Sequence, residues 1–314
     1  MNRVNTIIHL DAARKQGLTG KGVGVAILDT GIGYHPDLFP ASSTGYLVRF
    51  VDFVNHQTHY YDDNGHGTHI TGIIAGSGAG SQKLYRGIAP GCHFLSLKVL
   101  NQRGEGRIEH VLQAVQWLIE HQQKYRIRIV NISIGSSKGR HFSEDSPLVQ
   151  SINSLWEHGM LVLTAAGNHG PGGGSIGAPG NSRKIITVGS SDPLQQTNTN
   201  DYSSRGPTEM CIKKPDVVAP GSHVVSCHPS PQKDASLFTK GNASYQARSG
   251  TSMSTPIVSG CLALLLEKYP HLTNREVKLH LRNTSLDLGF HHTRQGWGLI
   301  QCDKLLETPP ALLS

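Results

Sequence analysis

The stretch that decides the fold is GVAILDTG, residues 24–31. Gly24 to Leu28 is a short apolar run with β-branched residues and no polar alternation, which indicates a strand buried on both faces. A carboxylate, Asp29, and a glycine turn follow at once. In parallel sheets, functional groups gather at the carboxyl ends of the strands. Taken alone, however, an aspartate here is as consistent with a capped turn as with a catalytic group.

Similar apolar runs recur along the chain and alternate with helical patterns. Apolar residues occur at helical spacing in residues 109–124 and 146–158. Strands that alternate with helices of this length favour βαβ units. We therefore expect an α/β fold: one domain with a mostly parallel, twisted sheet and helices on both faces. The further strand candidates are residues 93–100, 127–134, 160–165, 184–188, 217–219 and 224–226.

Composition bounds the class of protein. The chain has 314 residues, 37% hydrophobic and 16% charged, with 36 glycines, which argues against disorder. We find no repeat and no linker, so we expect one domain over residues 1–302 and a C-terminal tail over 303–314. The net charge is +7, but the basic residues are scattered, so we expect no nucleic-acid partner.

The expected compartment rests on segments and motifs that the sequence lacks. No stretch reaches the roughly 20 apolar residues of a membrane helix, so we expect no membrane partner. The N-terminus has no apolar signal segment, and the five cysteines form no Cys-x-x-Cys pair. We expect a cytoplasmic protein, with a secreted mature form as the alternative.

Three further sites join Asp29 as candidates for chemistry. His66 lies in DDNGHGTH, residues 62–69, and opens an apolar run that predicts a buried helix. Asn168 follows the strand predicted at residues 160–165. Ser252 lies in GTSMSTP, residues 250–256, before another buried helix. Ser and Thr are also common helix caps, so the Ser252 motif is ambiguous by itself.

Metal sites explain these residues less well. His66 and His69 form His-x-x-His, but no Glu follows His66 and no third ligand cluster is evident, so zinc is not favoured. Asp62 to Asn64 lacks the spacing of a calcium loop and more simply shapes the turn before His66.

The four sites together resemble the signature blocks of the subtilases, from about residue 10 to about residue 300. The chain order Asp, His, Ser is that of subtilisin, and differs from the orders in α/β-hydrolases and chymotrypsin. The resemblance implies a subtilisin-like three-layer fold and a serine endopeptidase. It implies Ser252 as nucleophile, His66 as general base and Asp29 as the group that orients it. Asn168 and the Ser252 N–H would donate to the oxyanion.

The resemblance also implies a cleft that holds an extended polypeptide substrate. Residues 131–135 would pair with the substrate backbone, opposite residues 100–106. Small residues would leave an open, uncharged S1 pocket, and we expect a preference for large apolar P1 side chains. His169 is a candidate rim residue. The implied S1 walls are Ser133, Ile134, Gly135, Ala165, Gly167 and Gly177; the opposing strand contains Leu100, Gly104 and Gly106; and an apolar S4 would contain Ile108, Val111 and Ile134.

Two positions depart from what the family leads one to expect. Asp37 matches a position that many subtilases use for structural calcium, but residues 77–86 lack the Asn-rich ligands and carry Lys83 and Arg86. A strong calcium site is therefore not favoured, and catalysis needs no cofactor. Ser254 stands where the family usually has Ala, and its hydroxyl either bonds to a carbonyl or slightly re-aims Ser252.

Some alternatives stay open. The leaderless layout most resembles the intracellular alkaline-protease branch of bacterial subtilisins. A propeptide or protein inhibitor is a further partner that the family suggests, and the oligomeric state is not defined. A catalytically silent binding protein and an esterase or amidase with the same triad are the rival functions.

Overall fold

A computed structural model describes residues 1–39, 46–134, 144–193, 202–229 and 244–311. Gly135, one of the expected S1 residues, lies outside these ranges. In chain order the elements are α1 (Asn2–Ile7), α2 (Asp11–Lys15), β1 (Gly24–Asp29), β2 (Leu47–Asp52), α3 (His66–Ala75), η1 (Ala79–Ser81), β3 (His93–Lys98), α4 (Ile108–His121), β4 (Ile127–Ile132), α5 (Pro147–Glu157), β5 (Leu161–Ala165), β6 (Ile186–Ser190), β7 (Val217–Ala219), β8 (Val224–Cys227), β9 (Tyr245–Arg248), α6 (Thr251–Lys268), α7 (Asn274–Thr284), α8 (His292–Gln295) and α9 (Cys302–Glu307).

Seven parallel strands form the main sheet, in the order β2-β3-β1-β4-β5-β6-β7. The strand order reverses at β1, which has β3 on one side and β4 on the other. Ligands bind at such reversal points, outside the carboxyl ends of the strands. β1 is buried along its whole length, as its apolar sequence predicts. Its last residue, Asp29, therefore lies at the edge of the sheet where a site is expected.

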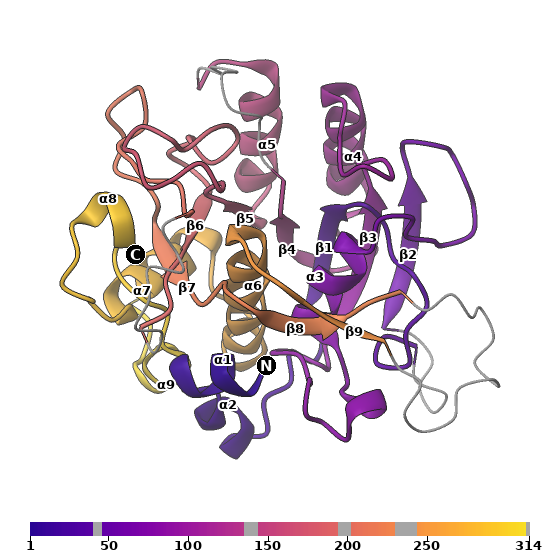
Figure 1. Ribbon diagram of the computed structural model, residues 1–314, viewed down its shortest axis with the longest axis horizontal. Coiled ribbons are helices and arrows are strands. Elements are labelled where there is room, and N and C mark those ends of the chain that lie inside the picture. The colour runs from indigo at the N-terminus through magenta and orange to yellow at the C-terminus, as the bar shows by residue number, and fades with distance from the viewer. Residues whose placement is uncertain (40–45, 135–143, 194–201, 230–243, 312–314) are drawn as a thin grey trace.

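Helices cover the sheet and complete the α/β three-layer fold. α3 and α6 pack against each other, α3 also against β1 and β3, and α6 against β4 to β7. α4 and α5 form a second pair, which stands at the top of Figure 1. α6 is apolar on every side and almost wholly buried. A helix of this kind belongs in the core, so its first turn, which contains Ser252, has a fixed position.

The sequence does not predict strands β2 and β9, because neither has an apolar run that indicates a buried face. β2 is a partly exposed edge strand with Arg49 in its middle. β9 is short and partly polar. It pairs antiparallel with β8 in a separate two-stranded sheet, so the strand predicted at residues 224–226 forms but lies outside the parallel sheet. β6 also begins two residues later than predicted.

The C-terminal boundary also differs from the prediction. Residues 303–307, placed in a tail, belong to α9, which packs against α2, α6 and α7. Leu305 and Leu306 are fully buried there, because their apolar side chains continue the core. The tail therefore begins after Glu307. Among the described helices, none is both long and apolar enough to cross a membrane.

Candidate active site

An aspartate and a histidine from two different elements meet at the edge of the sheet. Asp29 ends β1 and His66 begins α3, and the His66 Nδ1 lies 2.7 Å from the Asp29 Oδ1. The same Asp29 oxygen accepts the backbone N–H of Thr30 at 2.8 Å. Gly65, the cap before α3, has a φ of 89°, which favours glycine and lets the chain turn directly into the helix. The contact between Asp29 and the His66 Nδ1 leaves the other imidazole nitrogen, Nε2, facing away from Asp29.

The turn before His66 is organised by the carboxylate of Asp62. Its oxygens accept the backbone N–H groups of Asn64, Gly65 and Thr68. They also accept the hydroxyls of Thr30 and Thr68. Burial raises the pKa of Asp62, but these hydrogen bonds outweigh burial and hold it below its ordinary value. The acidic stretch before His66 therefore shapes the turn, as the sequence indicated.

The protonation of His66 reflects competing effects. Burial disfavours the charged imidazolium, but the charge of Asp29 and its hydrogen bond outweigh burial, so the pKa of His66 is raised. Arg248 acts in the opposite direction. A histidine with a raised pKa is a stronger base once it is neutral, as proton abstraction requires.

Ser252 lies in the first turn of α6, next to the end of β4. Its Oγ donates to the carbonyl oxygen of Ser133 at 3.1 Å. In return, the Ser133 hydroxyl donates to the Ser252 carbonyl at 3.2 Å. The hydrogen bonds of the Ser252 hydroxyl do not include His66. The Ser252 hydroxyl therefore points toward the backbone just after β4.

Asn168 approaches the same helix start from the loop after β5. Its Oδ1 accepts the backbone N–H of Thr251 at 2.9 Å and the Thr251 hydroxyl at 3.1 Å. A Cβ at Gly250 would lie 3.2 Å from the Asn168 Nδ2, so the glycine permits this close approach. The amide NH₂ of Asn168 has no partner among the described residues, and the residue is exposed. The oxygen anchors the side chain and leaves the NH₂ group to act as a donor.

The hydroxyl of Ser254 bonds to carbonyls outside α6. The residue is buried, and its hydroxyl donates to the carbonyl oxygens of Ala219 and Pro220, at 3.0 and 3.1 Å. Of the two outcomes expected for this departure, bonding to a carbonyl is confirmed. The carbonyls belong to the end of β7 and not to the preceding turn of α6.

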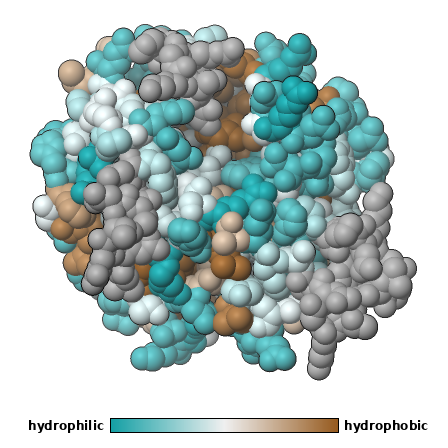
Figure 2. Space-filling model, in the orientation of Figure 1, coloured by the Kyte–Doolittle hydropathy of each residue, from teal (hydrophilic) through white to brown (hydrophobic). Residues whose placement is uncertain are grey.

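A cavity of about 740 Å³ extends from His66 between α4 and α5. Figure 2 shows apolar surface in this region, bordered by hydrophilic residues. Residues 100–106 form one wall: Leu100 and Gly106 make an isolated antiparallel bridge, and Gly104 has a φ of 76°. Eight of the residues that the sequence predicted for the substrate cleft line this cavity: Leu100, Gly104, Gly106, Ile108, Val111, Ser133, Ile134 and His169.

Three expected wall residues do not line this cavity. Ala165 is buried within β5, and Gly167 and Gly177 are partly buried. Ala178 and Pro179 line the cavity instead. Both directly follow Gly177 in the chain, and the expected role of Gly177 at the base of S1 stays a prediction.

Several residues at the site gave no local signal in the sequence. Leu148 and Ile152 belong to the apolar helical pattern at residues 146–158, which predicts only a buried helix face, yet they also line the cavity. Lys98, fully buried at the end of β3, donates to the carbonyls of Thr30 and Leu100 and pairs with Asp63 at 2.6 Å. A lysine at the end of an apolar strand is the one clue that the sequence offered.

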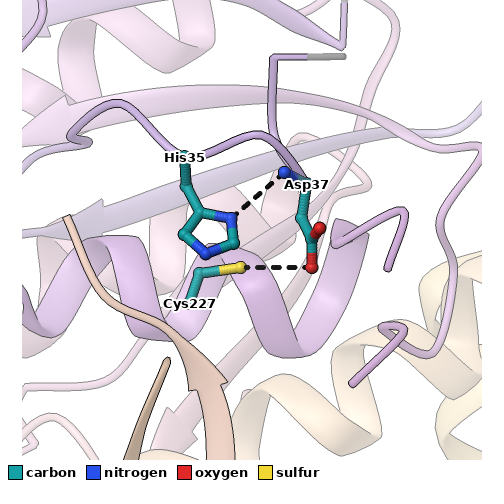
Figure 3. Close-up of side chains that lie close together, drawn as sticks. All are labelled: His35, Asp37 and Cys227. Atoms are coloured by element: carbon teal, nitrogen blue, oxygen red, sulfur yellow. Dashed lines mark hydrogen bonds between the residues drawn. The ribbon is translucent and has the colours of Figure 1, made fainter. Parts of the chain in front are cut away.

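The residues around Asp37 do not suit calcium. One Asp37 oxygen accepts the N–H of Gly80 at 2.7 Å and the other accepts the Tyr245 hydroxyl at 3.0 Å. The Cys227 thiol also faces this carboxylate, at 3.9 Å, with His35 beside it (Figure 3). Calcium is bound by six to eight oxygen ligands, whereas here the neighbours are hydrogen-bond donors.

The same cluster is not arranged for a softer metal either. His35, Asp37 and Cys227 place one atom each within 4.8 Å of one another. However, the His35 Nδ1 accepts the Asp37 N–H at 3.1 Å, and its Nε2 donates to the Ser244 carbonyl at 2.9 Å. Burial, followed by the charge of Asp37, raises the pKa of the Cys227 thiol well above its ordinary value. The groups therefore satisfy one another.

His69 holds α3 against the small sheet. Its Nε2 lies 2.9 Å from the Gln246 carbonyl and 3.1 Å from the Val224 carbonyl. Burial lowers the pKa of His69 to about 3, so the ring is neutral. His69 and His66 thus face different partners.

Comparisons with known proteins agree with this geometry. A family model for the subtilase family (Peptidase S8) matches residues 20–298. The serine protease AprX of Bacillus subtilis (strain 168) is 42% identical over 280 residues, which cover 85% of this chain and 62% of that protein. The chain thus spans less than two thirds of AprX. Subtilisin Savinase of Lederbergia lenta is 34% identical, covering 94% of this chain and 95% of that protein.

Solved structures show the same similarity in three dimensions. Sphericase superposes with a TM-score of 0.70 at 28% identity, covering 90% of this chain and 92% of that one. A cold-adapted subtilisin-like serine proteinase gives a TM-score of 0.69 at 26% identity, covering 91% and 90%.

Proposed function

The chain belongs to the subtilase family of serine proteases, and we propose that it hydrolyses peptide bonds with Ser252 as nucleophile, His66 as general base and Asp29 as the group that orients His66. The observation that carries this proposal is the 2.7 Å contact between Asp29 and His66 at the mouth of a cavity that leads past Ser133. Ser133 is the residue against which the Ser252 hydroxyl rests.

The proposed reaction has two halves. The Ser252 Oγ attacks the scissile carbonyl carbon while its proton passes to the His66 Nε2. The tetrahedral intermediate then collapses, the C–N bond breaks, and His66 gives the proton to the leaving amine. Water, activated by the same imidazole, hydrolyses the acyl-enzyme and restores the Ser252 hydroxyl. Asp29 stabilises the imidazolium throughout.

Charge on the substrate oxygen would be stabilised at the start of α6. The unpartnered amide NH₂ of Asn168 and the backbone N–H of Ser252 are the proposed donors. The first N–H groups of a helix have no acceptor within the helix, and the helix dipole favours negative charge there. Because Thr251 holds the Asn168 oxygen, the donor is positioned before substrate arrives.

We propose that the substrate is an extended polypeptide with a large apolar P1 side chain. Residues 100–106 and the end of β4 form two opposing edges of the cavity, where backbone groups can add a strand. The apolar side chains between α4 and α5 include the expected S4 residues Ile108, Val111 and Ile134, and they favour apolar substrate groups in the interior of the cavity. The residues concerned are Leu100, Ile108, Val111, Ile134, Leu148 and Ile152.

A fluorophosphonate probe and a casein assay test the assignment together. We expect the unmutated protein to be labelled and to cleave casein, and Ser252→Ala to do neither. If Ser252→Ala is labelled as well as the unmutated protein, Ser252 is not the nucleophile. Labelling without casein cleavage favours an esterase or amidase, and no labelling at all favours a binding protein.

A further inference from the structure

Two arginines line the cavity beside Glu105, the one carboxylate among the described lining residues. They are Arg103 and Arg107, and both are exposed. Among the described residues, neither arginine makes an ion pair with a carboxylate. Glu105 is itself exposed, with the Asn101 amide 3.4 Å from its Oε2. The cavity wall therefore carries more positive than negative charge.

The position of Arg107 adds to the positive charge at the cavity wall. Arg107 is the N-cap residue of α4, where the helix dipole already presents positive charge. Capping positions favour side chains that accept hydrogen bonds, and the Arg107 side chain makes no capping hydrogen bond. Glu109 in the first turn offsets part of this charge. A cation at this point does nothing evident for the helix, and it faces the cavity.

A third arginine, Arg248, lies near His66 but outside the cavity lining. The Arg248 Nε donates to the Gln246 side chain at 3.0 Å, and its Nη2 lies 3.4 Å from the Asn64 carbonyl, two residues before His66. Arg248 ends β9, four residues before Ser252, and its charge acts on His66, so it lies near the two residues past which a strand leaving the cavity would run.

The carboxylates near His66 do not cancel these charges at the surface. Asp29 is buried against His66, and Asp63 is paired with Lys98. Asp62 is held inward by its hydrogen bonds to the turn before α3. The arginines of the cavity wall and Arg248, beside the turn before His66, therefore leave net positive charge near the cleft.

We propose that the cleft selects acidic polypeptide segments, with Arg103 and Arg107 favouring acidic side chains on the acyl side of the scissile bond and Arg248 favouring them on the leaving-group side. This inference rests on the proposed function, for which it names a substrate class. The net charge of +7 acts in the same direction, because it concentrates acidic chains around the protein.

Besides its proposed contact with the substrate, Arg248 changes the pKa of His66. Its charge lowers the pKa of His66 against the opposing effect of Asp29. Removing the charge therefore leaves His66 protonated to higher pH. The charged and titratable groups that act on His66 come from four places: Asp29 of β1, Asp62 before α3, His69 of α3 and Arg248 of β9.

Quenched fluorescent peptides with one fixed apolar P1 residue test the proposal. Asp, Gln or Lys is placed at one position at a time, on either side of the scissile bond. We expect kcat/KM to fall from Asp to Gln to Lys, by about fivefold per charge step at low salt, as for two charges about 4 Å apart in water. The differences should shrink at high ionic strength.

Substitutions locate the effect. Arg103→Gln and Arg107→Gln should reduce the Asp-to-Lys ratio on the acyl side, and Arg248→Gln on the leaving-group side. Arg248→Gln should also shift the acid limb of kcat/KM for the neutral peptide to higher pH. Arg282→Gln, an exposed residue of α7, is the matched control and should change none of these ratios.

The outcomes separate this inference from the proposed function. Cleavage of the neutral peptide with equal rates for Asp and Lys overturns the charge selection alone. If no peptide is cleaved, the proposed function fails, and charge selection is then measured by binding of the same peptides to Ser252→Ala, by fluorescence anisotropy. Tighter binding of the Asp peptides supports the inference, and equal or weaker binding overturns it.

Discussion

The hydroxyl of Ser252 donates to the carbonyl oxygen of Ser133 at 3.1 Å, so the proposed nucleophile rests on the substrate-binding edge and not on its proposed base. Catalytic hydrogen bonds are often loose without substrate and tighten when it binds. A peptide strand added along the end of β4 would place its own N–H groups near the Ser133 carbonyl. Such competition would release the hydroxyl to turn toward His66.

Asp29→Asn tests the role of the buried carboxylate. We expect kcat to fall about 10⁴-fold, as in the corresponding substitution of a chymotrypsin-like protease, with little change in the fold. In the unmutated protein, kcat/KM should rise with pH through the raised pKa of His66, because only the neutral imidazole accepts a proton. Without the Asp29 charge this acid limb should move to lower pH, since burial then dominates. A pH–rate profile measures both effects.

Asn168→Ala removes one of the two proposed oxyanion donors. The expected loss in kcat is about 10²–10³-fold with a small change in KM, because the donor acts on charge that develops in the transition state. The loss of 10²–10³ is the value known for this donor in subtilisin itself. An effect on KM alone would show that Asn168 binds the ground state, and a collapse of thermal stability would show a mainly structural role.

Ser254→Ala should change stability and not catalysis. The substitution removes two hydrogen bonds to buried carbonyls, and the Ala219 carbonyl keeps the N–H of Ser191 as a donor. We expect the free energy of unfolding to fall by about 1 kcal/mol. Urea denaturation and kcat/KM, measured on the same preparation, check this. A large drop in kcat with unchanged stability would show that Ser254 does aim Ser252.

The environment of Asp37 predicts that this site contributes no calcium-dependent stability. A calcium site at 100 times its Kd would add about 2.7 kcal/mol, which a chelator would abolish. We expect the same melting temperature in EDTA and in excess calcium. Asp37→Asn should nevertheless destabilise the protein, because the donors from Gly80 and Tyr245 lose a charged acceptor. A calcium-dependent melting temperature that Asp37→Asn abolishes would contradict this.

Local patterns in the sequence indicated most of the sheet and the first turns of its main helices. Unbroken apolar runs identified β1, β3, β4, β5 and β7, because strands covered on both faces lack polar alternation. Glycines marked the turns that lead into α3 and α6. Edge strands such as β2 escaped detection, since half-exposed strands mix polar and apolar residues without a clear period.

The sequence by itself determined the chemical groups, their order along the chain and the family to which they point. Tertiary structure alone decided which donors face which acceptors. It brought Asp29 to His66 across 37 positions, turned the Ser252 hydroxyl to Ser133, and satisfied the Asp37 carboxylate with protein donors. It also placed Arg103 and Arg107 in the cavity wall and Arg248 beside the turn before His66. The reason is physical: strand and helix patterns are periodic and local, whereas a hydrogen bond or a surface field depends on atoms that only the folded chain brings together.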